Sequence, residues 1–246
     1  MRPMTRDGTR RTGSSRRIFF VLLTSGLLMR AHTPVPSEKR PPGAGTPPVV
    51  AMALLAALLS ASVASSAVII VAGDCTLVDA MTAANTDAPA GSCPAGSGTD
   101  RIVLTEDVAL SRVVSTGEDG DSGTPVVTSE IRIEGNGHVV ERLPGSPAFM
   151  IFQVAAGGGL SLDSVEVRGG LESDVGGILN IGVLALSNTT VADNKGGPAG
   201  IENRGTATIR DSTVTGGDGG NSGGIGNYFV HLTLVNSSVS GNEGSN

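Results

Sequence analysis

The sequence of 246 residues lacks tryptophan and contains one tyrosine and five phenylalanines. A core built around large aromatic side chains is therefore excluded. Aromatic platforms for sugar rings are also scarce, and after residue 67 they are limited to Phe149, Phe152, Tyr228 and Phe229. Glycine is abundant instead, with 36 residues. Together with many small and β-branched residues, this composition favours short strands joined by tight corners.

Positive charge is scarce in most of the chain. Residues 68–246 contain eight Lys/Arg against twenty-one Asp/Glu. Because binding to phosphates requires a basic surface, we expect no nucleic-acid partner. The acidic surplus is consistent with solubility alone.

Cysteine is limited to Cys75 and Cys93. A closed zinc site needs four ligands, so metal binding by this pair alone is not expected. In an exported chain the two thiols can pair, and closing the short loop between them would stabilise the fold by roughly 3 kcal/mol. We therefore expect a disulfide if the chain is exported.

The first residues are unlike the rest. Residues 1–48 are basic and then proline-rich, which predicts disorder; an upstream start codon would also account for them. The apolar run 49–71 follows, with a basic lead and small residues near its end. These are the features of a secretory signal peptide, so we interpret 49–67 as the export segment, cleaved after Ala64 or Ala67. The alternative is an uncleaved membrane anchor, because the run is long enough to span a bilayer.

The second half of the chain is an internal repeat. One column of valines recurs every 23–25 residues, at Val167, Val191, Val214 and Val239. Asparagines recur at the same period, at Asn180, Asn203 and Asn227. A period in the twenties predicts a solenoid, whose coils bury their apolar faces against one another. We expect the valines to form a core stack and the asparagine amides to form a hydrogen-bonded ladder along the stack.

Three further sets of residues repeat with the same period. Alternate residues of one strand should stack about 4.8 Å apart, namely Leu160/Leu162, Leu184/Leu186, Ala207/Ile209 and Leu232/Leu234. A second polar ladder is expected at Ser164, Asn188, Asp211 and Asn236. Glycine-rich corners are expected at Gly169-Gly170, 195–197, Gly216-Gly217 and Gly241-Asn242.

A short helix is predicted before the β pattern. Leu77, Ala80, Met81 and Ala84 share one face of a helix over residues 75–85. A solenoid needs a cover for the apolar end of its first coil, and this helix is placed to provide it. The β pattern is expected to begin at Arg101.

The same segment, Cys-Thr-Leu-Val-Asp-Ala-Met-Thr-Ala-Ala-Asn, resembles the CSLREAI motif of exported bacterial β-helix proteins. In that family an Asp-x-Ile-x-Leu strand follows, and residues 100–104 read Asp-Arg-Ile-Val-Leu. The chain departs from the family at Val78, Asp79 and Met81, where the family has Arg, Glu and Ile. The resemblance implies an all-β, single-stranded right-handed parallel β-helix over residues 68–246 with a short N-terminal capping helix. It implies no catalytic residues.

The sequence predicts no catalytic, cofactor or metal site. Glycoside hydrolysis needs two carboxylates at a fixed separation, and lyases need a base near the substrate. Four acids of the repeat region do not share one position in the repeat, so they do not line up on one face: Asp163, Asp193, Asp211 and Asp218. His138 and His231 have no catalytic partner at a readable spacing. The acidic loop 118–124 offers oxygen ligands but lacks the spacing of a defined calcium loop, so we interpret it as solvated.

These features favour a secreted or surface-displayed structural or binding protein, adhesin-like, whose partner is a polysaccharide or a cell-surface ligand. The alternative is a carbohydrate-active enzyme, a polysaccharide lyase or glycoside hydrolase. Acids grouped with Arg or Lys in a groove on one face of the β-helix would favour the enzyme. A smooth face covered by Ser, Thr and Asn would favour the binding protein. Membrane contact is expected only through the export segment or a missing C-terminal anchor, because we interpret the chain as truncated at its C-terminus.

Overall fold

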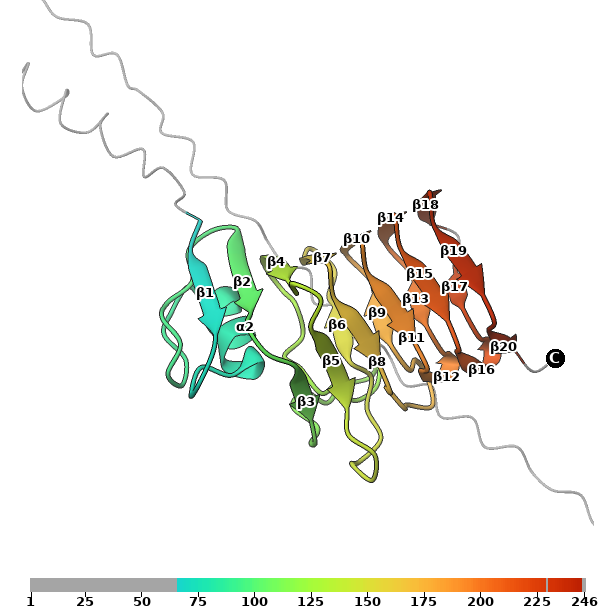
Figure 1. Ribbon diagram of the computed structural model, residues 1–246, viewed down its shortest axis with the longest axis horizontal. Coiled ribbons are helices and arrows are strands. Elements are labelled where there is room, and N and C mark those ends of the chain that lie inside the picture. The colour runs from blue at the N-terminus through green and yellow to red at the C-terminus, as the bar shows by residue number, and fades with distance from the viewer. Residues whose placement is uncertain (1–65, 229, 245–246) are drawn as a thin grey trace, which may run out of the picture. The chain divides into compact units, whose positions relative to one another are not determined.

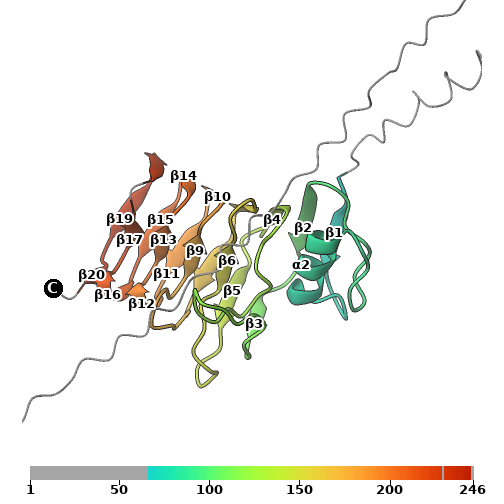
Figure 2. The same cartoon turned by 180° about the vertical axis from the view of Figure 1, so that it is seen from behind.

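The computed structural model describes residues 66–228 and 230–244. The predictions for residues 1–48 and for most of the export segment therefore lie outside the described residues. The described chain is an all-β, right-handed parallel β-helix with one short helix, which confirms the predicted fold class. Figures 1 and 2 show equivalent strands of successive coils lying side by side in continuous sheets.

Four parallel sheets run along the β-helix. The seven-stranded sheet contains β1 (Val68–Val71), β2 (Asp100–Leu104), β4 (Glu130–Glu134), β7 (Gly159–Asp163), β10 (Val183–Ser187), β14 (Thr206–Arg210) and β18 (His231–Val235). The six-stranded sheet contains β3 (Val108–Leu110), β5 (Val139–Arg142), β8 (Glu166–Arg168), β11 (Thr190–Ala192), β15 (Thr213–Thr215) and β19 (Ser238–Ser240). The four-stranded sheet contains β6 (Phe152–Val154), β9 (Ile178–Asn180), β13 (Ile201–Asn203) and β17 (Ile225–Asn227). The three-stranded sheet contains β12 (Lys195–Pro198), β16 (Asp218–Ser222) and β20 (Glu243–Gly244).

The β pattern begins earlier than predicted. Strand β1 pairs with β2, so the first strand lies well before the expected start at Arg101. Its sequence, Val-Ile-Ile-Val, is entirely β-branched, which favours a strand. Ile69 and Val71 are buried, whereas Val68 and Ile70 are exposed. The end of the long apolar run is thus half-buried sheet.

The predicted valine stack is confirmed in its register and in the burial of its first three members, whereas Val239 is exposed. Val167, Val191, Val214 and Val239 are successive partners in the six-stranded sheet. The predicted pairs of alternating apolar residues are successive partners in the seven-stranded sheet. Strand alternation explains this, since residues two apart point to the same face and equal positions in successive coils meet. The core therefore consists mainly of columns of aliphatic side chains, and Phe149 and Phe152 are also buried in it.

The predicted asparagine ladder is also confirmed. Asn180 Nδ2 donates to Asn203 Oδ1 over 2.7 Å, and Asn203 Nδ2 donates to Asn227 Oδ1 over 2.7 Å. The ladder begins at Asn180, because the equivalent residue of the preceding coil is Val154. Among the described residues, Asn180 Oδ1 consequently has no hydrogen-bond partner although it is buried.

The second predicted polar ladder is confirmed only in part: Asn236 Nδ2 donates to Asp211 Oδ1 over 3.3 Å, and among the described residues no other bond joins two side chains of this column. Its members Ser164, Asn188, Asp211 and Asn236 all have positive φ, between 49° and 55°. They turn the corner between two sheets, where a short polar side chain tolerates the left-handed conformation. The continuous polar column lies one residue later and was not predicted. Thr189 N donates to Ser212 Oγ, and Ser212 N donates to Ser237 Oγ.

One predicted corner was wrong. The residues equivalent to Gly169-Gly170 are Asp193-Asn194, whereas residues 195–197 lie in β12. Asn194 Oδ1 accepts a hydrogen bond from Gly170 N over 2.9 Å, so the asparagine of one coil caps the glycine corner of the coil before it. A Cβ on Gly170 would lie 2.0 Å from Gly176 O, which requires glycine there. Asn242 and Gly217 repeat the arrangement.

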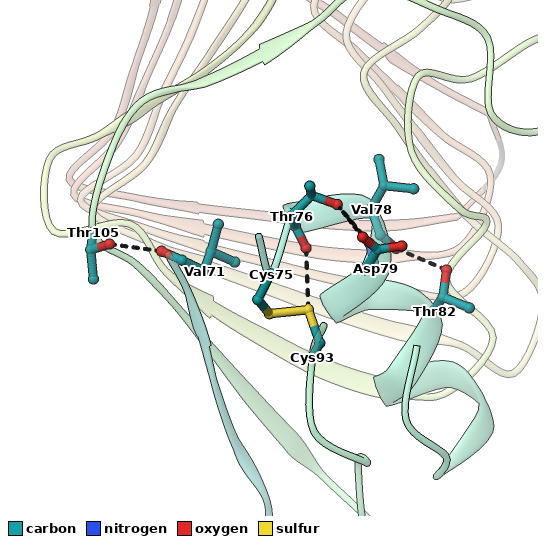
Figure 3. The surroundings of a disulfide bond; sticks show 8 residues. All are labelled: Val71, Cys75, Thr76, Val78, Asp79, Thr82, Cys93 and Thr105. Atoms are coloured by element: carbon teal, nitrogen blue, oxygen red, sulfur yellow. Dashed lines mark hydrogen bonds between the residues drawn. A yellow bond between two sulfur atoms is a disulfide. The ribbon is translucent and has the colours of Figure 1, made fainter. Parts of the chain in front are cut away.

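The predicted capping helix is α2 (Leu77–Thr86). Thr76 is its N-cap: Thr76 Oγ1 accepts from Asp79 N and donates to Asp79 Oδ2 (Figure 3). The first of these bonds is that of an N-cap, and the second joins the two side chains, so Asp79 holds the Thr76 hydroxyl in place. The four residues predicted to share the buried face are all buried.

Two further features attach the cap to the β-helix. The predicted disulfide between Cys75 and Cys93 is formed across 18 residues, and it joins the start of α2 to the loop that follows the helix (Figure 3). Asn85, near the end of α2, donates to Val126 O over 2.8 Å and accepts from Thr128 N over 2.9 Å. The helix is therefore connected to the segment that leads into β4.

Candidate ligand-binding groove

The outer face of the four-stranded sheet is partly covered. Its outward column consists of Gln153, Leu179, Glu202 and Gly226, one from each strand. Leu179 is fully buried because it packs with Met150 and Val175 in a small cluster outside the main core. An outward-facing column that is buried is unusual for a solvent-exposed sheet, and it places Glu202 at the edge of the covered region.

A groove lies next to this covered region, over β13 and β17. Its volume is about 300 Å³, and its lining combines charged, amide, hydroxyl and aromatic side chains. The lining residues are Ser173, Asp174, Gly197, Pro198, Glu202, Arg204, Asn221 and Tyr228. They come from three successive coils, so stacking of the repeats brings them together.

The charged groups of the groove form a chain of ion pairs. Arg204 Nε donates to Glu202 Oε1, and Arg204 Nη1 donates to Asp119 Oδ1 over 3.1 Å. The side chain of Glu202 is 5% exposed, whereas the side chain of Arg204 is 42% exposed. Burial of Arg204 opposes its charge, but its bonds to Glu202 and Asp119 outweigh burial and raise the pKa of the guanidinium. The buried carboxylate is thus compensated within the groove wall.

Tyr228 is the exposed aromatic residue of the groove. It follows β17 directly and is 41% exposed. A Cβ on Gly226 would lie 3.0 Å from Pro198 Cγ and 3.1 Å from Tyr228 Cε2. The rings of Pro198 and Tyr228 therefore both lie over Gly226, and the absence of a side chain there lets them approach the sheet.

The loop 118–124, interpreted as solvated, is packed in part: Asp119 pairs with Arg204 of the groove, and Ser122 and Thr124 are fully buried. The other acids and the histidine described here lie elsewhere. Asp211 occupies a corner, Asp193 occupies another, and Asp218 forms an exposed ion pair with Lys195. His138 contacts Asp107, and the bonds that Asp107 accepts from Val139 N and His138 lower the pKa of its carboxyl group. These acids do not line the groove.

Sequence reasoning missed the acids of the groove. Glu202 lies between Ile201 and Asn203, two inward residues, so its outward direction was readable from the repeat. Its pairing with Arg204 was also readable, because the two residues are close in sequence. The contribution of Asp119 was not, because it lies 85 residues before Arg204.

Of the other aromatic residues that could have served as platforms for sugar rings, Phe149 and Phe152 are fully buried, and Phe229 lies outside the described residues. A second hollow of about 190 Å³ lies between the start of α2 and β3, near Val78 and Leu110. Arg112 is the one charged residue of its described lining. This hollow offers less polar chemistry than the groove.

Within residues 66–228 and 230–244, no group of three or more His, Cys, Asp or Glu side chains is placed to hold a metal ion. No helix in this part of the chain has the length and apolarity needed to cross a membrane. Comparisons of the chain with protein-family models, curated proteins and solved structures gave no match.

Proposed function

We propose that this chain is a secreted or surface-displayed β-helix protein of the adhesin type, which binds a polysaccharide or another cell-surface ligand. The supporting observation is the groove over β13 and β17, where the exposed ring of Tyr228 lies beside hydrogen-bonding side chains. Ligand sites commonly combine an apolar surface with a few polar groups that fix orientation. Stacked repeats also offer extended lateral faces for contact.

The ion pairs of the groove favour binding over catalysis. The general acid of a glycoside hydrolase has to deliver a proton to the leaving group. Glu202 instead accepts from Arg204, which also binds Asp119. This arrangement uses the buried carboxylate to orient the guanidinium and to join two distant segments.

The second candidate is a carbohydrate-active enzyme on the same scaffold. One observation favours it: Glu202, Asp174 and Arg204 line one groove on one β-face. This grouping of acids with an arginine is the feature expected of an enzyme. The two functions differ in whether a bound polysaccharide is cleaved.

The test is to incubate the purified full chain with a panel of soluble polysaccharides. Retention in affinity gels measures binding, and assays for reducing and unsaturated ends measure cleavage. We expect retention without released ends. Ends that are released by the native chain and lost in Glu202→Gln would support the enzyme and contradict our proposal.

Export is part of the proposal. The cap of the β-helix contains a disulfide, and disulfides persist in oxidising compartments outside the cytosol. The resemblance of residues 75–85 and 100–104 to exported bacterial CSLREAI-motif proteins supports the same location. Mass spectrometry of the protein from its native compartment should find a chain that begins after Ala64 or Ala67 and has no free thiols. Two free thiols would contradict export.

A further inference from the structure

We infer that the groove over β13 and β17 binds a neutral, hydroxyl-rich sugar ring stacked on Tyr228, and that it excludes polysaccharides made of uronic acids. This inference rests on the function proposed above and specifies its ligand class. Three features of the described residues carry it: the charge of the groove, the aromatic ring, and the polar groups around that ring.

The charge of the groove disfavours an anionic ligand. Glu202 and Asp174 line the groove, and Asp119 reaches its single lining cation, Arg204. Two of the guanidinium nitrogens, Nε and Nη1, already donate to carboxylates. Three carboxylates therefore lie at or beside the groove, and two of them are paired with its one guanidinium. A uronate carboxylate would meet excess negative charge and an arginine that already pairs with two carboxylates.

Tyr228 supplies a surface that a sugar ring can stack on. The ring lies over Gly226 beside Pro198, where a Cβ would be in close contact with both residues. A tyrosine offers a large contact area and loses little conformational entropy on binding, because it has only two side-chain torsions. The apolar C–H face of a neutral sugar suits such a ring.

The groups around the ring are suited to hydroxyls. Asn221, Ser173 and Asp174 are exposed at the groove and offer an amide, a hydroxyl and a carboxylate. Asp174 N donates to Glu172 Oε2 over 2.6 Å, so the backbone of this loop is held in place where Asp174 lines the groove. The volume of about 300 Å³ is at the small end of ligand sites, which fits a short stretch of a saccharide.

The experiment compares neutral polysaccharides with their uronate counterparts. The full chain is titrated with galactan and polygalacturonate, mannan and polymannuronate, and glucan and polyglucuronate. Affinity electrophoresis and calorimetry measure the dissociation constants. We expect at least one neutral polymer to bind, and to bind at least tenfold tighter than its uronate counterpart.

Variants then assign the binding to the groove. Tyr228→Ala should weaken binding of the neutral polymer at least tenfold, whereas Tyr228→Phe should retain it, because stacking does not need the hydroxyl. Asp174→Lys should strengthen binding of the uronate polymer. Val183→Ala is the matched control, since Val183 is 51% exposed on a different sheet and should leave binding unchanged. Thermal unfolding verifies that each variant is folded.

The outcomes separate this inference from the proposed function. Tighter binding of a uronate polymer would overturn the inference and leave a polysaccharide-binding function in place. Binding of a neutral polymer that Tyr228→Ala leaves unchanged would place the site elsewhere and also overturn the inference. If no polymer of the panel binds, polysaccharide binding itself is contradicted.

Discussion

The two ends of the described β-helix differ in how far their apolar side chains are buried. At the N-terminal end, α2 covers the first coil, and Leu77 and Met81 are 1% and 0% exposed. In the last described coil, Leu234 and Val239 are 46% and 43% exposed, although the other members of their columns are at most 1% exposed. Position in the repeat therefore defines a column, but a neighbour on both sides is needed for burial.

The largest expected effect comes from the same substitution in the middle and at the end of one column. Leu186 and Leu234 occupy equivalent positions. Leu186→Ala should lower the free energy of unfolding by about 2–5 kcal/mol, because it leaves a cavity. Leu234→Ala should cost only about 1 kcal/mol, since much of that side chain is already exposed. Urea unfolding of both variants measures the difference, and equal losses would contradict the comparison.

The disulfide tests how much the cap contributes at the other end. Replacing Cys75 and Cys93 together by alanine should destabilise the fold by about 3 kcal/mol, because a loop of this length gains entropy in the unfolded chain. The measurement is the unfolding midpoint with and without reductant. The double variant contains no cysteine and should be insensitive to reductant, whereas reduction should lower the midpoint of the native chain. A native chain whose midpoint does not change with reductant would contradict the prediction.

The asparagine ladder provides a second pair of equivalent residues. Asn203 is fully buried and bonds to both neighbours, whereas Asn227 is exposed. Asn203→Val should cost about 2 kcal/mol, because it removes ladder bonds and leaves buried polar groups without partners. Asn227→Val should cost less than about 1 kcal/mol, since Asn227 is exposed and Asn203 Nδ2 keeps its bond to His231 O. A reversed order in thermal unfolding would exclude the ladder as a source of stability.

The smallest expected effect concerns pH and the cap. Asp100 is fully buried beside α2; its burial raises the pKa of the carboxyl group, although a bond from Ser97 N opposes this. The folded protein therefore holds this proton at pH values where the unfolded chain has lost it. The contribution to stability is complete below the ordinary aspartate pKa of about 3.9 and is lost as pH rises through the raised value. Asp100→Asn should remove this pH dependence in urea unfolding between pH 3 and pH 7.

Asp107 is the control for that experiment, because its pKa is shifted in the opposite direction. The bonds from Val139 N and His138 lower the pKa of Asp107. Its contribution is therefore present above the ordinary aspartate pKa and is lost as pH falls through the lowered value. The native chain should lose some stability as the pH falls below the ordinary aspartate pKa, and Asp107→Asn should remove this loss in urea unfolding. The same pH profile for both variants would contradict the assignment of the two shifts.

The predictions from sequence succeeded where one residue type recurs in one environment. The valine column and the asparagine ladder were readable because the parallel register places identical side chains next to one another. The corner at Asp193-Asn194 was misassigned because glycine was used as the only corner signal, and a left-handed aspartate serves there instead. The strand Val68–Val71 was not predicted, although the β-helix was expected to begin at residue 68, because these four residues continue the apolar run of the export segment without a break.

The repeat period, the inward columns and the helical cap followed from sequence alone, since each depends on spacing between neighbouring coils. The groove depended on tertiary structure. Asp119 reaches Arg204 from a loop 85 residues away, and Tyr228 lies beside Pro198 only because their coils stack. A local pattern encodes which way a side chain points, but the partner it meets across coils is decided by how irregular loops pack onto the regular stack.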